Sequence, residues 1–216
     1  MLENERKRVA ASARRLAADG LVLGTAGNVS ARAEELVAVT PTGAALERLA
    51  ADEVAVVDLD GMLVEGDLAP TSELALHLGA YRRYGAGAVV HTHAPVATAL
   101  SCVLDELPVV HYQMLALGGA VRVAPYATFG TQQLADLTLD ALADRSAALM
   151  SNHGTLCTAA DVGSALENTL LLEWAATIYW RACTVGTPRL LDDDQIADYR
   201  RTVAARGYGP LHRARA

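Results

Sequence analysis

Two histidines two residues apart, His91 and His93, are the clearest chemical feature of this sequence. They lie in a β-branched run, residues 88–94, that predicts a central strand. Side chains two apart on a strand point to the same face, so the two imidazoles can reach one ion. Zinc suits such a pair, because its catalytic sites use three protein ligands and keep one position open. His153, between an apolar run and Gly154, is the candidate third ligand, although spacing alone leaves its membership open.

Glu73 is the candidate proton-transfer group. It stands in the first turn of a predicted helix, where the helix dipole favours an anionic side chain, so a purely capping role is a real alternative. Thr71 and Ser72 place hydroxyls at the expected N-cap, and with the free N–H groups of that helix they would form an anion site. The glycine-rich loop 24–27 with Asn28 could form a second one. A carboxylate between a phosphate site and a metal is well placed to move a proton.

Other reactive side chains are weaker candidates. Lys7 is the only lysine and stands in a charged N-terminal helix. A Schiff-base mechanism needs a desolvated lysine and is therefore excluded. His77, one helical turn after Glu73, could face the same pocket, but packing or hydrogen bonding is the favoured interpretation. His111 ends a predicted strand and is ambiguous.

The three cysteines, Cys102, Cys157 and Cys183, are odd in number and far apart. They form neither a disulfide framework nor a metal-binding CxxC motif. We expect reduced, mostly buried thiols. A catalytic Cys157 is the minor alternative to an inert packing role.

Hydrophobic periodicity indicates the elements that must position these side chains. A glycine-rich polar loop is expected at 24–32, and a hairpin over 54–64 turns at Asp60-Gly61. The helix at 162–185 has an almost wholly apolar middle, so it should be covered on most sides. The expected helices are 3–19, 74–84, 97–104, 132–144 and 162–185, and the other expected strands are 35–40, 88–94, 109–111, 121–124 and 147–150. This order favours an α/β sandwich with a mixed sheet between helical layers.

Length and composition limit the function classes. The 216 residues, 52% of them hydrophobic, suffice for one sizeable core, so we expect a single domain over 1–216 with a mobile tail at about 207–216. The net charge of −7 argues against a nucleic-acid surface. The sequence contains no run of about 18 uncharged apolar residues, so no membrane span is expected. The charged N-terminus does not resemble a signal peptide. The expected location is the cytoplasm.

Seven segments in register carry a resemblance to a known family. They are Thr25–Ser30, Thr40–Gly43, Pro70–Glu73, Val90–His93, His111-Tyr112, Ala124–Gly130 and Asn152–Gly154. With them the chain resembles the class II aldolase/adducin family, and within it the bacterial L-fuculose-1-phosphate aldolases most. Where family members often carry paired serines before the glutamate, this chain has Thr71-Ser72, which keeps both hydroxyls.

The resemblance implies a fold and a site. The fold would be a single-domain α/β/α sandwich with a mixed, largely antiparallel central sheet. His91, His93 and His153 would bind one Zn²⁺ per subunit, with Mn²⁺ or Co²⁺ as alternatives, and Glu73 would be the acid/base and a fourth ligand in the empty enzyme. The residues implied for the substrate are Asn28, Thr42, Gly43, Thr71 and Ser72 at its phosphate, Phe129 beside the aldehyde, and Tyr208 on the C-terminal tail. Catalytic Tyr112 would enter from a neighbouring subunit of a C4 homotetramer.

The implied reaction is reversible cleavage of a ketose 1-phosphate, such as L-fuculose 1-phosphate, to dihydroxyacetone phosphate and an aldehyde. The main alternatives share the scaffold: a pentulose-phosphate 4-epimerase, a methylthioribulose-1-phosphate dehydratase and a tetronate-phosphate decarboxylase. An epimerase is expected to carry aspartate at position 73, so Glu73 favours an aldolase or a dehydratase. A non-catalytic adducin-like assembly module should have lost metal ligands, whereas all three candidates are present here.

Overall fold

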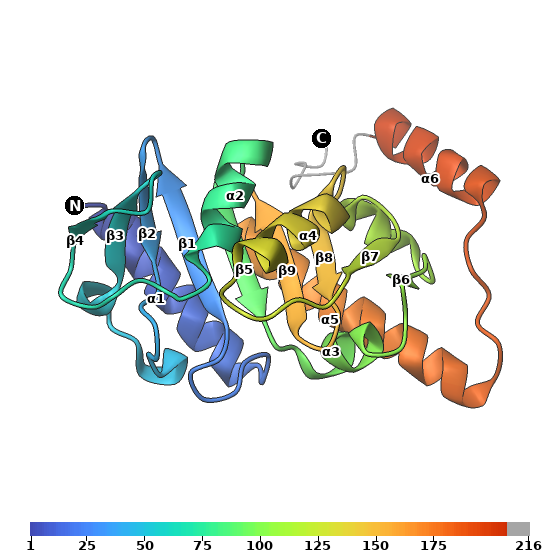
Figure 1. Ribbon diagram of the computed structural model, residues 1–216. Coiled ribbons are helices and arrows are strands. Elements are labelled where there is room, and N and C mark those ends of the chain that lie inside the picture. The colour runs from blue at the N-terminus through green and yellow to red at the C-terminus, as the bar shows by residue number, and fades with distance from the viewer. Residues whose placement is uncertain (207–216) are drawn as a thin grey trace.

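The computed structural model describes residues 1–206, so the expected tail at 207–216, including Tyr208, lies outside the described residues. A nine-stranded sheet runs through the molecule in the order β4-β3-β2-β1-β5-β9-β8-β7-β6 (Figure 1). The strands are β1 (Asn28–Ala33), β2 (Leu36–Val39), β3 (Ala55–Asp58), β4 (Leu63–Glu65), β5 (Ala88–Thr92), β6 (Glu106–Leu107), β7 (Val121–Ala124), β8 (Ala147–Met150) and β9 (Gly154–Ala159). Only β7 and β8 pair in parallel. The predicted mixed, largely antiparallel sheet is confirmed.

Helices cover both faces of this sheet. The α-helices of the described residues are α1 (Glu3–Ala18), α2 (Leu74–Tyr84), α3 (Pro95–Ser101), α4 (Gln132–Leu142), α5 (Val162–Val185) and α6 (Asp193–Arg206). The first five form the two layers of an α/β/α sandwich: α2 and α4 pack over one face, and α1, α3 and α5 cover the other (Figure 1).

Strand periodicity on β5 decides where the site forms. Val89 is buried against α2 and α4, and Val90 is buried in the core on the opposite face. Because side chains alternate along a strand, His91 shares the face of Val89. His91 therefore points towards the layer of α2, at whose start Glu73 lies.

Two central strands, β1 and β9, differ from the expectation. The residues of β1 were expected in a polar loop, since Asn, Gly and Ser are typical of turns. In the structure β1 pairs with β2 and β5, and its polar Ser30 is fully buried. β9 pairs with β5 and β8 just after His153. Both strands are stabilised by neighbours on either side, which local sequence patterns do not reveal.

The expected strand at 109–111 is wrong. That segment is irregular, and the short strand β6 lies just before Pro108 instead. Proline has no N–H to donate to a ladder, which explains why pairing stops there. The Val109 carbonyl instead accepts a hydrogen bond of 2.9 Å from the backbone N–H of Leu191, on the segment that leads to α6.

The two C-terminal helices differ in how far they are covered. α5 has the predicted bounds, and in its apolar middle, residues 170–178, the side chains are buried or partly buried except that of Trp174. Trp180, nearer the end of α5, is also exposed. No element was expected at α6, which lies beyond the β6 end of the sheet and has no buried residue (Figure 1).

The cysteine expectation is correct for one residue of three. Cys157 is buried in β9, and burial raises the pKa of its thiol to about 12, which favours an inert packing role. Cys102 and Cys183 are exposed, contrary to the expectation. Among residues 1–206, no helix has both the length and the apolar character needed to cross a bilayer.

Candidate metal centre and active site

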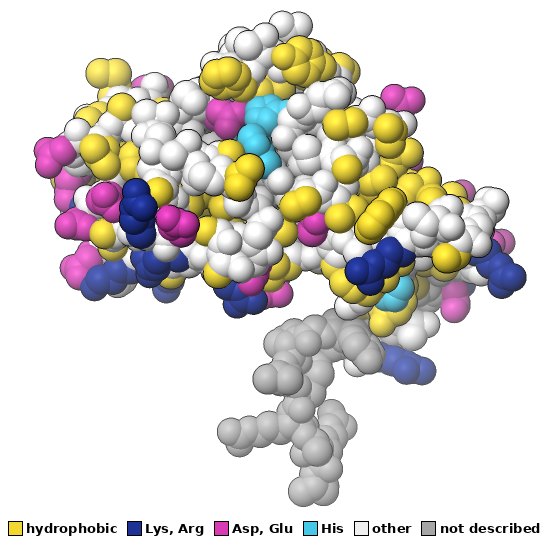
Figure 2. Space-filling model, turned by 90° about the horizontal axis from the view of Figure 1, so that it is seen from below, with side chains coloured by type: hydrophobic (Ala, Val, Ile, Leu, Met, Phe, Trp, Pro, Cys, Tyr) yellow, Lys and Arg dark blue, Asp and Glu magenta, His cyan; other side chains and the backbone are white. Residues whose placement is uncertain are grey.

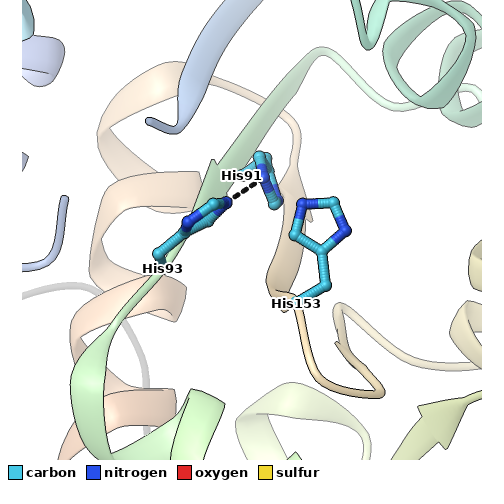
Figure 3. Close-up of side chains that lie close together, drawn as sticks. All are labelled: His91, His93 and His153. Carbon is cyan, nitrogen blue, oxygen red and sulfur yellow. Dashed lines mark hydrogen bonds between the residues drawn. The ribbon is translucent and has the colours of Figure 1, made fainter. Parts of the chain in front are cut away.

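Three histidines converge at one end of the central strands. His91 belongs to β5, His93 follows the end of that strand, and His153 lies in the turn between β8 and β9 (Figure 3). The β5–β9 ladder ends at the pair Thr92 and Thr155, and it thereby brings this turn next to His91 and His93. Gly154 is required here, since a Cβ on it would lie 2.2 Å from the carbonyl oxygen of Thr92.

The three imidazoles are arranged as ligands of one ion. Their ring centroids are 5.0 Å apart in each pair, the rings are nearly perpendicular, and one nitrogen of each lies within 4.8 Å of the others. The Nε2 atoms of His91 and His93 are 3.1 Å apart (Figure 3). Two nitrogens bound tetrahedrally to zinc at about 2.05 Å would be about 3.3 Å apart. The geometry fits a divalent ion of this size.

The protonation states also fit a metal. His91 is fully buried, and its Nδ1 lies 2.8 Å from the carbonyl oxygen of Thr155. A carbonyl only accepts, so Nδ1 carries a proton and Nε2 faces the cluster, where a metal ion would take the place of a second proton. Burial, with repulsion from His91 second, lowers the pKa of both His93 and His153 to about 4. Neutral imidazoles with converging lone pairs form a cation site.

Glu73 completes the cluster from α2. It occupies the N-cap position, not the first turn as expected, and its side chain makes no capping hydrogen bond. Its Oε2 accepts a hydrogen bond of 2.9 Å from Asn28 Nδ2 and lies 3.2 Å from His91 Nε2, while Oε1 lies 3.4 Å from His153 Nε2. The alternative of a purely capping role is therefore wrong.

One oxygen of this carboxylate lacks a hydrogen-bond partner. Glu73 is only 7% exposed, and its buried Oε1 accepts no hydrogen bond from the described residues. Burial alone would raise the pKa of Glu73, but the charge and hydrogen bond of His91, followed by Asn28 and His153, hold it well below its ordinary value. A bound cation would act in the same direction. A buried carboxylate oxygen without a hydrogen-bond partner, beside three converging imidazole nitrogens, is a set of ligand atoms that fits a divalent cation.

A polar cavity of about 460 Å³ opens next to the histidines. It is lined by Thr25, Ala26, Gly27, Asn28, Pro41, Thr42, Gly43, Thr71, Ser72, Glu73, His93, Tyr126, Ala127, Phe129, Asn152 and His153. All five residues implied for phosphate binding are in this set, and so is Phe129. None of the described lining residues is Lys or Arg. Near the top of Figure 2, histidine and acidic side chains lie side by side, with no Lys or Arg side chain next to them.

Three loops are tied together to form this cavity. Asn28 begins β1 opposite His91 on β5. The loop at Thr42 donates its N–H to Ala69, at 2.9 Å, and Thr71 donates to the carbonyl of Thr40, at 3.1 Å. Hydroxyl, amide and glycine residues of three separate segments thus line one space, which is a typical way to bind a small anion without a basic side chain.

The N-cap prediction for Thr71 and Ser72 is corrected in detail. Glu73 is the N-cap residue of α2, and the Thr71 hydroxyl oxygen accepts a hydrogen bond of 3.3 Å from its N–H. Both hydroxyl residues still line the cavity, because the turn before α2 faces it. Tyr126 and Asn152 also line the cavity, but they were not predicted as site residues. Their positions in the sequence, close to Phe129 and His153, could have indicated them.

Tyr112 lies outside this cavity. It is 49% exposed. The centroid of its ring lies 4.4 Å from that of His111 and 5.3 Å from that of Tyr199 on α6, and the rings are tilted to one another. His111 itself accepts a hydrogen bond from the N–H of Gln113 and lies edge-on to Trp174. His77 is fully buried with both ring nitrogens in hydrogen bonds, so its expected hydrogen-bonding role is confirmed.

The fold and the site define an α/β protein with a divalent-metal site beside a polar cavity. Residues 7–180 match the Class II Aldolase and Adducin N-terminal domain. The chain is 37% identical over 212 residues to the 5-deoxy-D-ribulose 1-phosphate aldolase of Bacillus thuringiensis serovar kurstaki, covering 97% of this chain and 99% of that protein. It is 39% identical over 181 residues to the L-fuculose phosphate aldolase of Escherichia coli K12, covering 82% and 84%.

A solved structure of L-fuculose 1-phosphate aldolase superposes with a TM-score of 0.89 at 32% identity, covering 93% of this chain and 96% of that one. The chain therefore belongs to the class II aldolase and adducin family, and it is a metal-dependent lyase of the class II aldolase type.

Proposed function

We propose that the chain is a zinc-dependent aldolase that reversibly cleaves a ketose 1-phosphate to dihydroxyacetone phosphate and an aldehyde. The observation that carries this proposal is the position of Glu73. Its carboxylate lies next to the histidine cluster and also lines the polar cavity. The relatives named above, which act on 5-deoxyribulose and fuculose phosphates, support the substrate class.

His91, His93 and His153 would hold the ion. When bound, the ion supplies a Lewis acid that stabilises the negative charge developing on the substrate as the carbon–carbon bond breaks. Three neutral imidazoles leave the full charge of a divalent ion in place, which suits an anionic intermediate. Lys7, the only lysine, is exposed on α1 and makes an ion pair with Glu3. It does not line the cavity beside the histidines.

Glu73 would move the proton on the dihydroxyacetone fragment. In the cleavage direction the hydroxyl at carbon 4 would give its proton to the Glu73 carboxylate, the bond between carbons 3 and 4 would break, and the electron pair of that bond would stay with carbon 3 as an enediolate. Glu73 would then deliver a proton to carbon 3, and in the aldol direction its carboxylate would remove it. The lowered pKa of Glu73 keeps its carboxylate ionised, so it can accept a proton.

The substrate phosphate would bind to the Asn28 amide, the backbone N–H of Gly43 and the hydroxyls of Thr42, Thr71 and Ser72. Phe129 is 68% exposed on the same cavity and would contact the aldehyde end. A terminal methyl group, as in a deoxyketose, would gain from an aromatic neighbour of this kind. These assignments make a deoxyketose 1-phosphate the first substrate to test.

Tyr112 would act in the site of a second subunit of a C4 homotetramer, at the aldehyde end. Its exposure and its absence from the cavity of its own chain support this role. The exposed Trp174 and Trp180 on α5 also favour an oligomer, since aromatic side chains are enriched at interfaces.

A panel assay tests the proposal. The protein with Zn²⁺ is incubated with the 1-phosphates of 5-deoxyribulose, fuculose, rhamnulose and ribulose, and dihydroxyacetone phosphate is measured with a coupled enzyme. We expect release from at least one deoxyketose phosphate. Consumption of these substrates with an epimer or a dehydrated product, and no dihydroxyacetone phosphate, would overturn the aldolase assignment.

A further inference from the structure

A line of buried hydrogen bonds leads from the interior of α2 to Glu73. The Tyr81 hydroxyl bonds to Ser30 Oγ, which lies 2.6 Å from His77 Nδ1. His77 Nε2 lies 2.5 Å from Asn28 Oδ1, and Asn28 Nδ2 lies 2.9 Å from Glu73 Oε2. Ser30, His77 and Tyr81 are at most 1% exposed, and Asn28 is 5% exposed. Water therefore does not compete for these bonds.

The donor and the acceptor of each hydrogen bond in this line can be assigned. The Glu73 carboxylate accepts from the amide nitrogen of Asn28, which leaves the Asn28 oxygen as an acceptor for a proton on His77 Nε2. A neutral imidazole with its proton on Nε2 has its lone pair on Nδ1, so the Ser30 hydroxyl donates to it. Tyr81 then donates to Ser30. Burial, with repulsion from His91 second, lowers the pKa of His77 to about 3, which agrees with a neutral ring.

We infer that His77 is a positioning residue that fixes the Asn28 amide with its NH₂ group towards Glu73 and the cavity. An asparagine amide can turn over at little cost unless its two ends are told apart by their partners. The donor on His77 Nε2 holds the Asn28 oxygen away from the cavity. One hydrogen of the Asn28 NH₂ group is then donated to Glu73, and the second can be donated to an anionic ligand.

The opposite orientation would damage the site. It would place the Asn28 oxygen against the Glu73 carboxylate and against any bound phosphate, so that two acceptors faced each other without a proton. His77 does not itself line the cavity, and it reaches the lining through its hydrogen bond to Asn28, so its effect passes through Asn28. This inference rests on the proposed function only for the identity of the anion.

Paired variants separate this role from a structural one. His77→Gln keeps a donor near the Nε2 position, whereas His77→Met keeps the volume and removes it. We expect His77→Met to bind metal normally, to lose about 10- to 100-fold in kcat/KM, and to bind inorganic phosphate more weakly in calorimetry of the metal-free protein. His77→Gln should recover most of both losses. Tyr81→Phe, which removes the far end of the line, should affect the unfolding temperature more than phosphate affinity.

A spectroscopic measurement needs no variant to fold well. In the wild-type protein with ¹⁵N-labelled histidine, the His77 ring should show a protonated Nε2 and an unprotonated Nδ1. The reverse tautomer would overturn the inference, and so would unchanged phosphate affinity in His77→Met or failure of a folded His77→Gln to recover it. The tautomer and phosphate affinity do not depend on which bond the enzyme cleaves, so they fail independently of the panel assay.

Discussion

Replacement of His91 by alanine is expected to abolish stoichiometric metal binding and ketose-phosphate cleavage together. His91 is the most constrained of the three ligands, fully buried in β5 and held by the Thr155 carbonyl, so no other side chain can move into its place. If binding energies of about 10–16 kcal/mol are shared by three or four ligands, one ligand is worth roughly 3–4 kcal/mol. That loss lowers metal affinity by roughly 10²- to 10³-fold.

The measurement is the metal content per chain after dialysis, together with dihydroxyacetone phosphate release. Cys102→Ser is a matched control, because it removes an exposed potential ligand that lies outside the cavity and should leave both quantities unchanged. A His91→Ala protein that keeps one ion per chain and full turnover would show that the histidine cluster is not the metal site.

Replacement of Glu73 by glutamine is expected to leave the metal bound and to lower kcat by about 10²- to 10⁴-fold, the usual range for a lost acid/base group. Glutamine keeps the size of the side chain and can still accept from Asn28 through its amide oxygen, so the fold of α2 should persist. What it loses is the ability to take up and return a proton.

Metal content and single-turnover cleavage, measured on the same preparation, separate this role from that of a ligand. Glu173→Gln is the control: this half-buried carboxylate accepts from the N–H groups of Val96 and Ala97 and does not line the cavity, so its kcat should stay close to wild type. Loss of the ion from Glu73→Gln would make Glu73 chiefly a ligand, and unchanged kcat would remove it from the chemistry.

The sequence allowed correct prediction of most elements, since periodicity and turn residues are local signals. α2 and α5 have the predicted bounds, and the hairpin of β3 and β4 turns at Asp60-Gly61 as expected. The misses have non-local causes. β1 carries Asn28 and Ser30, which are typical of loops, and becomes a central strand because β2 and β5 flank it and α2 supplies partners for its polar groups.

The candidate site was predictable where one strand or one motif carries it. His91 and His93 follow from strand spacing, and the family resemblance added His153 and the cavity residues. The junction of the loops at Pro41 and Pro70 is a tertiary pairing with no local signal. The hydrogen bonds of His77 depend likewise on the packing of α2 against β1, and the site of action of Tyr112 depends on a second chain.

The most direct test of the whole account is a metal titration of cleavage. The chelated protein, given the best ketose 1-phosphate from the panel, should release no dihydroxyacetone phosphate, and Zn²⁺ should restore release with saturation at one equivalent per chain. Full release by the metal-free protein would contradict the account, and so would a protein that binds one equivalent of zinc and still cleaves none of the ketose phosphates.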